Sequence, residues 1–425
     1  MIPIFRYPKK ELWQELAIRP AIDNALIEPE VAKILLDIKN NGIEAVRRYT
    51  SIFDGVSSAQ FQVSAEELRT KANEVDSRLA KAINTAYANI EVFHKAQLRE
   101  TAFIETMPGI LCWRKGIPIE KVGIYIPGGT APLFSTVLML GIPAKIGGCN
   151  EIILCTPPNK NYSIHPAIAY AAQLIGIEKV FILGGIQAIG AMAYGTNEIP
   201  KVNKIFGPGN QYVTCAKQLV SKEGIAIDLP AGPSELAVIA DESCNPEFVA
   251  ADLLSQAEHG IDSQVILVSD NDQVIQKVIL AVEEQLAKLP RREIAAKALQ
   301  NSKAFLVNTI EEGMDLINTY APEHLIIACL NDDDVAKKVI NAGSVFLGNY
   351  SPESAGDYAS GTNHTLPTNG SARGFSGVSV DSFLKYVTFQ KITKEGLYNI
   401  AETIECVAQA EGLDAHKNAA RIRFS

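Results

Sequence analysis

The spacing of hydrophobic residues divides the chain into a helical stretch, a long stretch of alternating strands and helices, and a second helical stretch. From 29 to 100, apolar residues recur every three or four positions, as on one face of a helix. A first helix is expected at 30–41, where Gly42 gives a C-cap signal, and Ser64 opens a capping box with Glu67. Residues 76–100 predict a long helix with a core-facing side.

From 122 onward the period changes, and short runs rich in β-branched residues alternate with helix-compatible segments. The expected strands form two series, the first at 122–126, 151–155, 179–183 and 202–206, and the second at 236–240, 264–268, 304–307, 324–328 and 344–347. Such alternation indicates parallel sheets covered by helices on both faces. The sequence therefore predicts an α/β fold: two Rossmann-like parallel-sheet domains, an N-terminal helical region and a small C-terminal helical tail.

The same pattern gives a domain organisation. Residues 1–20 form an N-terminal arm with one short helix around 11–17, residues 21–120 join 235–378 in a first α/β domain, and residues 121–234 form the second. The tail at 379–425 is expected to be helical at 382–390, 394–409 and 415–422. Because it is too short for a core of its own, it should dock on the body or on a partner subunit.

Composition narrows the classes of partner. The 425 residues are 47% apolar and carry a net charge of −9, which argues against nucleic acid and against an anionic membrane surface. Seven scattered cysteines without a C-x-x-C pair suit buried thiols in a reducing compartment. With no secretory-type N-terminus and no apolar run of about 18 residues, the expected location is the cytoplasm.

Several polar residues stand out against this background. Gln256 and His259 lie three residues apart in a helix-forming run, so both could reach one metal ion. Taken alone, this stretch fits an amphipathic helix with a capping histidine better. Glu323 and His324 adjoin at the start of an expected strand and could share proton-transfer work, or be an ordinary surface pair. Asp357 lies in a long polar loop at 351–364, where it is either a hard ligand or a turn cap.

Glycine-rich turns follow the expected strands. They are Pro127-Gly128-Gly129, Gly184-Gly185, Gly207-Pro208-Gly209-Asn210 and Ala231-Gly232-Pro233-Ser234. Backbone that bends this sharply can present N–H groups to a phosphate, or can simply form a tight βα turn. None completes the dinucleotide fingerprint. Gly207-Pro208-Gly209 begins like it, but Tyr212 stands where the third glycine would be.

Taken together, these motifs resemble histidinol dehydrogenases, in the family's order and over nearly the whole chain. The matching stretches are Tyr125-Ile126-Pro127-Gly128-Gly129, Phe206-Gly207-Pro208-Gly209-Asn210, Pro230-Ala231-Gly232-Pro233-Ser234-Glu235, Ser255-Gln256-Ala257-Glu258-His259-Gly260, Pro322-Glu323-His324-Leu325, Ala355-Gly356-Asp357-Tyr358-Ala359-Ser360-Gly361-Thr362-Asn363-His364 and Ala415-His416-Lys417-Asn418. The resemblance implies oxidation of L-histidinol to L-histidine through the aldehyde, with one zinc ion per subunit and two NAD used in succession.

The resemblance also implies roles for individual residues. The zinc ligands would be Gln256, His259, Asp357 and His416, and the acid–base pair Glu323 and His324. The substrate would be held by Ser234, Gln256, His259, His324, Asp357, Glu411 and His416, and NAD by Tyr125, Gln187 and Asn210. A homodimer with exchanged terminal segments is implied, so that Glu411 and His416 come from the partner chain.

Two rival interpretations stay open at this point. A zinc hydrolase would use Glu323 as the base for a metal-bound water, and a non-catalytic two-lobed protein would only bind a small molecule. NAD-dependent turnover separates the dehydrogenase from both. His94, His165 and His364 are expected not to be metal ligands.

Overall fold

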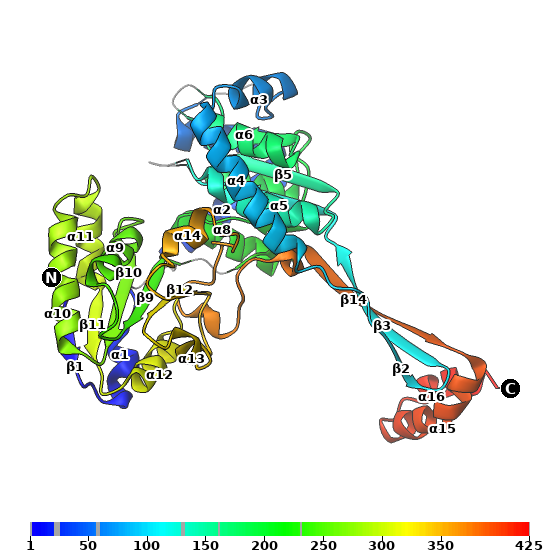
Figure 1. The fold of residues 1–425 in the computed structure, drawn as a ribbon. Coiled ribbons are helices and arrows are strands. Elements are labelled where there is room, and N and C mark those ends of the chain that lie inside the picture. Colours follow the sequence, from blue (N-terminus) through cyan, green and yellow to red (C-terminus); the bar gives the residue numbers. More distant parts are fainter. Residues whose placement is uncertain are drawn as a thin grey trace.

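The computed structural model describes residues 2–20, 26–56, 60–128, 132–159, 162–229 and 232–424. Of the glycine-rich turns, Gly129 and Ala231 lie outside the described residues, as does Pro230 of the family motif. The described chain forms two lobes and a projecting arm (Figure 1). No helix within these residues is long and apolar enough to cross a membrane.

Lobe 1 is built on a six-stranded parallel sheet. Its strands, in spatial order, are β1 (Ile4–Arg6), β11 (Lys303–Leu306), β10 (Gln264–Ser269), β9 (Glu235–Ala240), β12 (His324–Ala328) and β13 (Ser344–Leu347). The helices of this lobe are α1 (Trp13–Leu16), α9 (Pro246–Ala257), α10 (Asp272–Leu286), α11 (Arg292–Asn301), α12 (Ile310–Tyr320), α13 (Asp332–Ala336) and α14 (Glu353–Tyr358), with the 3₁₀ turn η1 (Lys10–Leu12). Successive residues of β9 enter opposite cores: Leu236 and Val238 pack with α9 and α10, whereas Ala237 and Ile239 pack with α12.

Lobe 2 has a five-stranded parallel sheet. The order is β6 (Lys179–Ile182), β5 (Glu151–Thr156), β4 (Lys121–Tyr125), β7 (Lys204–Phe206) and β8 (Ala226–Ile227). The helices between these strands are α5 (Phe134–Ile146), α6 (Pro166–Ile175), α7 (Gly185–Tyr194) and α8 (Gln211–Lys222). Two parallel sheets with helices on both faces confirm the predicted fold class.

The N-terminal helices belong to lobe 2. These are α2 (Glu28–Asp54), α3 (Ala65–Ala72) and α4 (Ser77–Lys95); α2 packs with α7 and α8 on one face of the lobe 2 sheet, and α3 and α4 pack with α5 and α6 on the other. The prediction that 21–120 joins 235–378 is therefore wrong for these helices, because an apolar helix face does not specify which sheet covers it. Within α2, the backbone leaves helical geometry at Gly42 (φ 53°, ψ −130°), where the sequence predicted a helix end, and a second helical segment continues beyond this kink.

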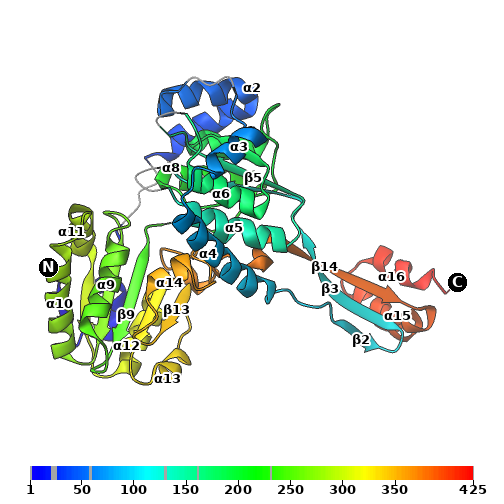
Figure 2. The same cartoon turned by 45° about the horizontal axis from the view of Figure 1, so that its top comes forward.

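The arm is a three-stranded antiparallel sheet with two helices at its far end (Figures 1 and 2). It contains β14 (Leu384–Ile392), β3 (Ile110–Pro118) and β2 (Phe103–Met107), then α15 (Lys394–Ala410) and α16 (Asp414–Arg421). The 3₁₀ turns η2 (Ser371–Arg373) and η3 (Val380–Phe383) lie along the chain before it. The helix predicted at 382–390 is wrong: Tyr386, Val387 and Phe389 favour a strand, and β14 pairs with β3 along its whole length.

Candidate active site

A cluster of polar side chains gathers in lobe 1 at the amino ends of β9 and β12. His324 is the first residue of β12, and Glu323 immediately precedes it. Helix α9 brings Gln256 and the turn after it His259, while α14 brings Glu353 and Asp357. The loop predicted at 351–364 thus contains a short helix, which the sequence pattern missed because six residues are too few to show a helical period.

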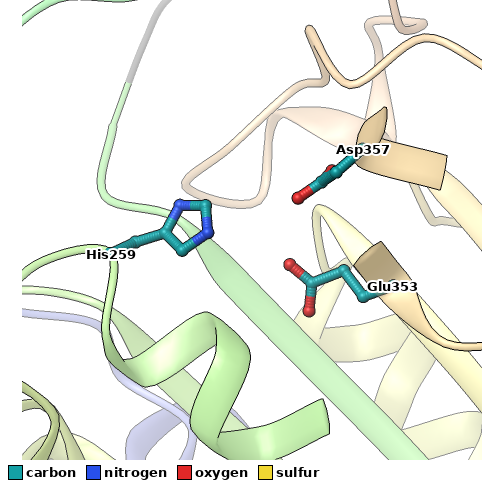
Figure 3. Close-up of side chains that lie close together, drawn as sticks. All are labelled: His259, Glu353 and Asp357. Carbon is teal, nitrogen blue, oxygen red and sulfur yellow. The ribbon is translucent and has the colours of Figure 1, made fainter. Parts of the chain in front are cut away.

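Three of these side chains point into one space, as Figure 3 shows. The nearest ligand-type atoms of His259, Glu353 and Asp357 all lie within 4.8 Å of one another. Glu353 and Asp357 are four residues apart in α14, so both project from the same face of that helix. Sequence reasoning passed over Glu353, although its spacing from Asp357 was the signal that could have identified it.

The imidazole of His324 lies among carboxylates. Its Nδ1 is 3.7 Å from Glu323 Oε2 and 3.8 Å from Glu353 Oε1, and its Nε2 is 3.7 Å from Asp357 Oδ1. Burial lowers the pKa of an imidazole, but the surrounding carboxylates outweigh it and raise the pKa of His324 to about 10. Burial raises the pKa of Glu323 to about 7 and that of Glu353 to about 8, against the opposing effect of His324.

Buried polar atoms without partners mark this cluster as a ligand site. Both polar atoms of the Gln256 amide, both carboxylate oxygens of Glu353 and Nε2 of His324 are buried and have no hydrogen-bond partner among the described residues. Buried polar groups are nearly always hydrogen-bonded, so several unpartnered ones in one place need a ligand. A surplus of carboxylates, together with amide and imidazole donors, suits a divalent cation such as zinc.

A second set of contacts holds Glu323 and His324, the predicted acid–base pair, in place. The backbone N–H of Glu235 donates to Glu323 Oε2 at 2.9 Å, and the Glu235 carbonyl lies 3.2 Å from His324 Nδ1. The carboxylate of Glu235 is in turn bound by Arg19, from Nε at 2.5 Å and Nη2 at 2.8 Å. The predicted N-terminal arm therefore reaches the site through one buried ion pair, and neither Arg19 nor Glu235 was singled out from the sequence as a site residue.

Lobe 2 carries a cavity of about 600 Å³ at the carboxyl ends of its strands. It is lined by the three residues predicted to contact NAD, Tyr125, Gln187 and Asn210. The Tyr125 hydroxyl accepts from the N–H of Gly185 at 3.1 Å, and the Asn210 side chain caps the first turn of α8. Gly207 has φ +123°, and a Cβ there would lie 2.0 Å from the Tyr125 carbonyl oxygen, so only glycine fits this turn.

The remaining predicted residues divide into two groups. Ser234 is half-buried and directly precedes β9, the strand whose amino end lies at the lobe 1 cluster. Glu411, at the C-cap of α15, and His416, in α16, are exposed. These two helices lie at the far end of the arm, well away from both lobes (Figures 1 and 2). One chain alone does not bring these two residues to the cluster.

The other three histidines have partners that fit structural roles. In α4, His94 Nδ1 lies 2.8 Å from the Ile90 carbonyl, and His165 caps α6 by accepting from the N–H of Ala167 at 3.2 Å. His364 lies closer to the cluster, with Nδ1 2.9 Å from the Asp357 carbonyl and Nε2 3.1 Å from Thr136 Oγ1. That these histidines are not metal ligands stays a prediction.

Two parallel-sheet lobes, one with a buried cluster of titratable groups and the other with a glycine-lined cavity, define a two-lobed α/β enzyme. The profile of the family described as histidinol dehydrogenase matches residues 17–424. Histidinol dehydrogenase of Bacteroides thetaiotaomicron is 56% identical over 425 residues, covering 100% of this chain and 99% of the relative. That of Colwellia psychrerythraea is 50% identical over 424 residues, covering 97% and 98%.

A solved structure is similar over the same length. The crystal structure of histidinol dehydrogenase from Elizabethkingia anophelis matches with a TM-score of 0.97 and 53% identity, covering 100% of this chain and 98% of that one. The chain belongs to the histidinol dehydrogenase family.

Proposed function

We propose that this chain is an NAD-dependent, zinc-containing enzyme that oxidises L-histidinol to L-histidine through L-histidinaldehyde, the last steps of histidine biosynthesis. The observation that carries the proposal is the buried cluster in lobe 1, where an imidazole among carboxylates lies beside an unpartnered amide. The family match extends over residues 17–424, which include every residue of the proposed site.

The metal would be held by Gln256, His259 and Asp357 of one chain, with His416 supplied by a second copy. Imidazole nitrogen and amide and carboxylate oxygens are donors that zinc accepts. When bound, zinc would orient the imidazole and amine of the substrate, and its charge would lower the pKa values of the neighbouring carboxyl and imidazole groups. The substrate would also be bound by Ser234 of the same chain and by Glu411 of the second copy.

The proton transfers fall to the two residues at the start of β12. In the first oxidation His324 accepts the hydroxyl proton while hydride leaves the carbinol carbon for NAD. In the second, Glu323 takes a proton from water as the water attacks the aldehyde, and His324 again accepts a proton while hydride passes to a second NAD. The hydrogen bond from the N–H of Glu235 fixes one oxygen of Glu323 for this work.

The cofactor would occupy the cavity in lobe 2. Tyr125, Gln187 and Asn210 line it, and its glycine-rich walls allow a dinucleotide to approach the backbone. The cavity follows the carboxyl ends of β4, β6 and β7, where parallel α/β sheets commonly bind their ligands.

We further propose a homodimer in which each site is shared between subunits. Strand β2 is exposed along its whole length, with Phe103 at 59% and Ile104 at 56%, and the arm helices expose Tyr398 at 72%. Apolar surface of this kind on a projecting element needs a partner. A second copy that covers the arm would bring its Glu411 and His416 toward the lobe 1 cluster.

The deciding experiment follows NADH absorbance after L-histidinol and NAD are added to the zinc-loaded protein, with and without a chelator. About two NADH per histidinol, lost on chelation and restored by zinc, is the expected result for a four-electron oxidation. Absence of NADH would overturn the proposal. Metal-dependent hydrolysis in its place would then indicate a zinc hydrolase, and binding without turnover a small-molecule binding protein.

A further inference from the structure

The lobe 2 cavity contains a carboxylate that the proposed NAD contacts do not include. Asp54, the last residue of α2, lines the cavity together with Tyr125, Gln187 and Asn210. Its Oδ2 accepts a hydrogen bond from Gln187 Nε2 at 3.0 Å. Helix α2 thus reaches across to the carboxyl ends of the lobe 2 strands and places an acid there.

Gln187 is placed to hold Asp54 rather than to contact a ligand through its own oxygen. Its side chain is only 1% exposed, and its Oε1 is buried without a hydrogen-bond partner among the described residues. Its side-chain Nε2 donates a hydrogen bond to Asp54 Oδ2. Asp54 is half-buried and keeps its second oxygen, Oδ1, free of any hydrogen bond to the described residues, so the acceptor that faces the cavity is the carboxylate.

Around Asp54 the lining of the cavity suits the base and ribose of a nucleotide rather than a phosphate group. Phe53 and Tyr212, exposed at 48% and 37%, line the same cavity and offer flat ring surfaces on which a purine can stack. Its charged residues among the described lining are Glu30 and Asp54, with no lysine or arginine to neutralise a phosphate. Burial raises the pKa of Asp54, so this carboxylate gains from a hydroxyl donor.

We propose that Asp54, positioned by Gln187, accepts hydrogen bonds from the hydroxyls of the adenosine ribose of NAD and thereby excludes NADP. An acidic side chain that binds a ribose diol repels a 2′-phosphate at the same position, because the two anions would lie within hydrogen-bonding distance. The inference rests on the proposed use of NAD, and it assigns the choice of cofactor to one residue of α2.

The test compares Asp54→Asn with wild type for binding of NAD and NADP, by calorimetry without substrate. Asparagine can still accept from Gln187, so the change removes charge while keeping that contact. NAD should bind about tenfold more weakly, the loss expected for a hydrogen bond to a charged group, and the ratio of NADP to NAD affinity should rise at least about tenfold. Unchanged affinity for NAD, or an unchanged ratio, would overturn the assignment.

Asp37→Asn is the matched control, since it removes the same charge from the same helix outside the cavity. Asp37 pairs with Arg48 on the surface, and its substitution should leave both affinities unchanged; a loss equal to that of Asp54→Asn would show a general charge effect and refute a ribose contact. Wild-type protein that neither binds NAD nor reduces it with histidinol would refute the proposed function itself. If wild-type protein reduces NAD with histidinol but the Asp54→Asn variant binds NAD and NADP with wild-type affinities, only the role of Asp54 is refuted.

Discussion

The buried pair of Arg19 and Glu235 links the N-terminal segment to the proposed acid–base residues, Glu323 and His324, and we expect Arg19→Met to test that link. The side chains are 14% and 2% exposed, and Arg19 also donates to the Tyr320 carbonyl at 2.7 Å. Removing one partner of a buried pair typically costs about 3–5 kcal/mol, because the remaining charge stays buried and unpaired. The N–H of Asn369, 2.7 Å from Glu235 Oε1, remains as a donor, so we expect about 3 kcal/mol.

The loss should depend on pH with a definite sign. Burial raises the pKa of Glu235 even with Arg19 beside it, and without Arg19 the pKa in the folded state rises further. Between the unfolded and folded pKa values the folded state holds more protons, so the free energy of unfolding of the variant falls as pH rises through this window. The deficit relative to wild type should therefore be larger at pH 7.5 than near pH 5.

Urea denaturation read by tryptophan fluorescence can measure this effect in lobe 1. The chain has two tryptophans, and Trp13 is 3% exposed in the core that Arg19 adjoins, so a Trp113→Phe background isolates its signal. Arg6→Met is the control, because the pair with Asp272 is about half exposed and such pairs contribute up to about 1 kcal/mol. Equal losses for Arg19→Met and Arg6→Met, or a deficit that does not change with pH, would refute the reasoning.

Three further predictions concern the two lobes and the arm. Glu323→Gln should slow oxidation of the aldehyde far more than oxidation of the alcohol, measured with each substrate separately; equal slowing would count against a role in activating water. Mixing His416→Ala with His259→Ala subunits should restore part of the activity in hybrid dimers, and no recovery would tell against a shared site. Gly207→Ala should raise the KM for NAD and cost at least about 1–3 kcal/mol of strain, whereas Gly224→Ala, at φ +91° with nothing within 4 Å, should leave that KM unchanged.

The sequence predicted best those elements whose own residues show the pattern of a strand or of a helix cap. Alternating apolar runs located both sheets, since a buried parallel strand must be hydrophobic along its length. Ser64 caps α3 by accepting from the N–H of Glu67 at 3.1 Å, which is one of the two hydrogen bonds of the predicted capping box. These features depend on neighbours in the chain, which a sequence displays directly.

Features that depend on distant partners were not predictable in the same way. Strand β14 pairs with β3, which lies more than 260 positions away in the chain, so the partner that fixes it as a strand is not visible in the local sequence. Likewise, nothing near Arg19 in the sequence indicates Glu235. The spacing of Glu353 from Asp357 places both on one face of α14, but its position beside His324 depends on how α14 packs against α9, which the local sequence does not show.

The cavity of lobe 2 and the polar cluster of lobe 1 lie at opposite ends of their parallel strands, and the difference fits what each site requires. The lobe 2 cavity uses the carboxyl ends of β4, β6 and β7, where glycine-rich turns expose the backbone. The lobe 1 cluster instead uses the amino ends of β9 and β12, where His324↔Leu236 pairing sets Glu323 beside the N–H of Glu235. A rule that places ligands only beyond carboxyl ends therefore locates the cavity proposed for the cofactor and misses the lobe 1 cluster. Side chains that transfer protons must be held rigidly, and the hydrogen bonds between paired strands hold a strand end rigidly. A cofactor instead needs glycine turns, because they let it approach the backbone closely.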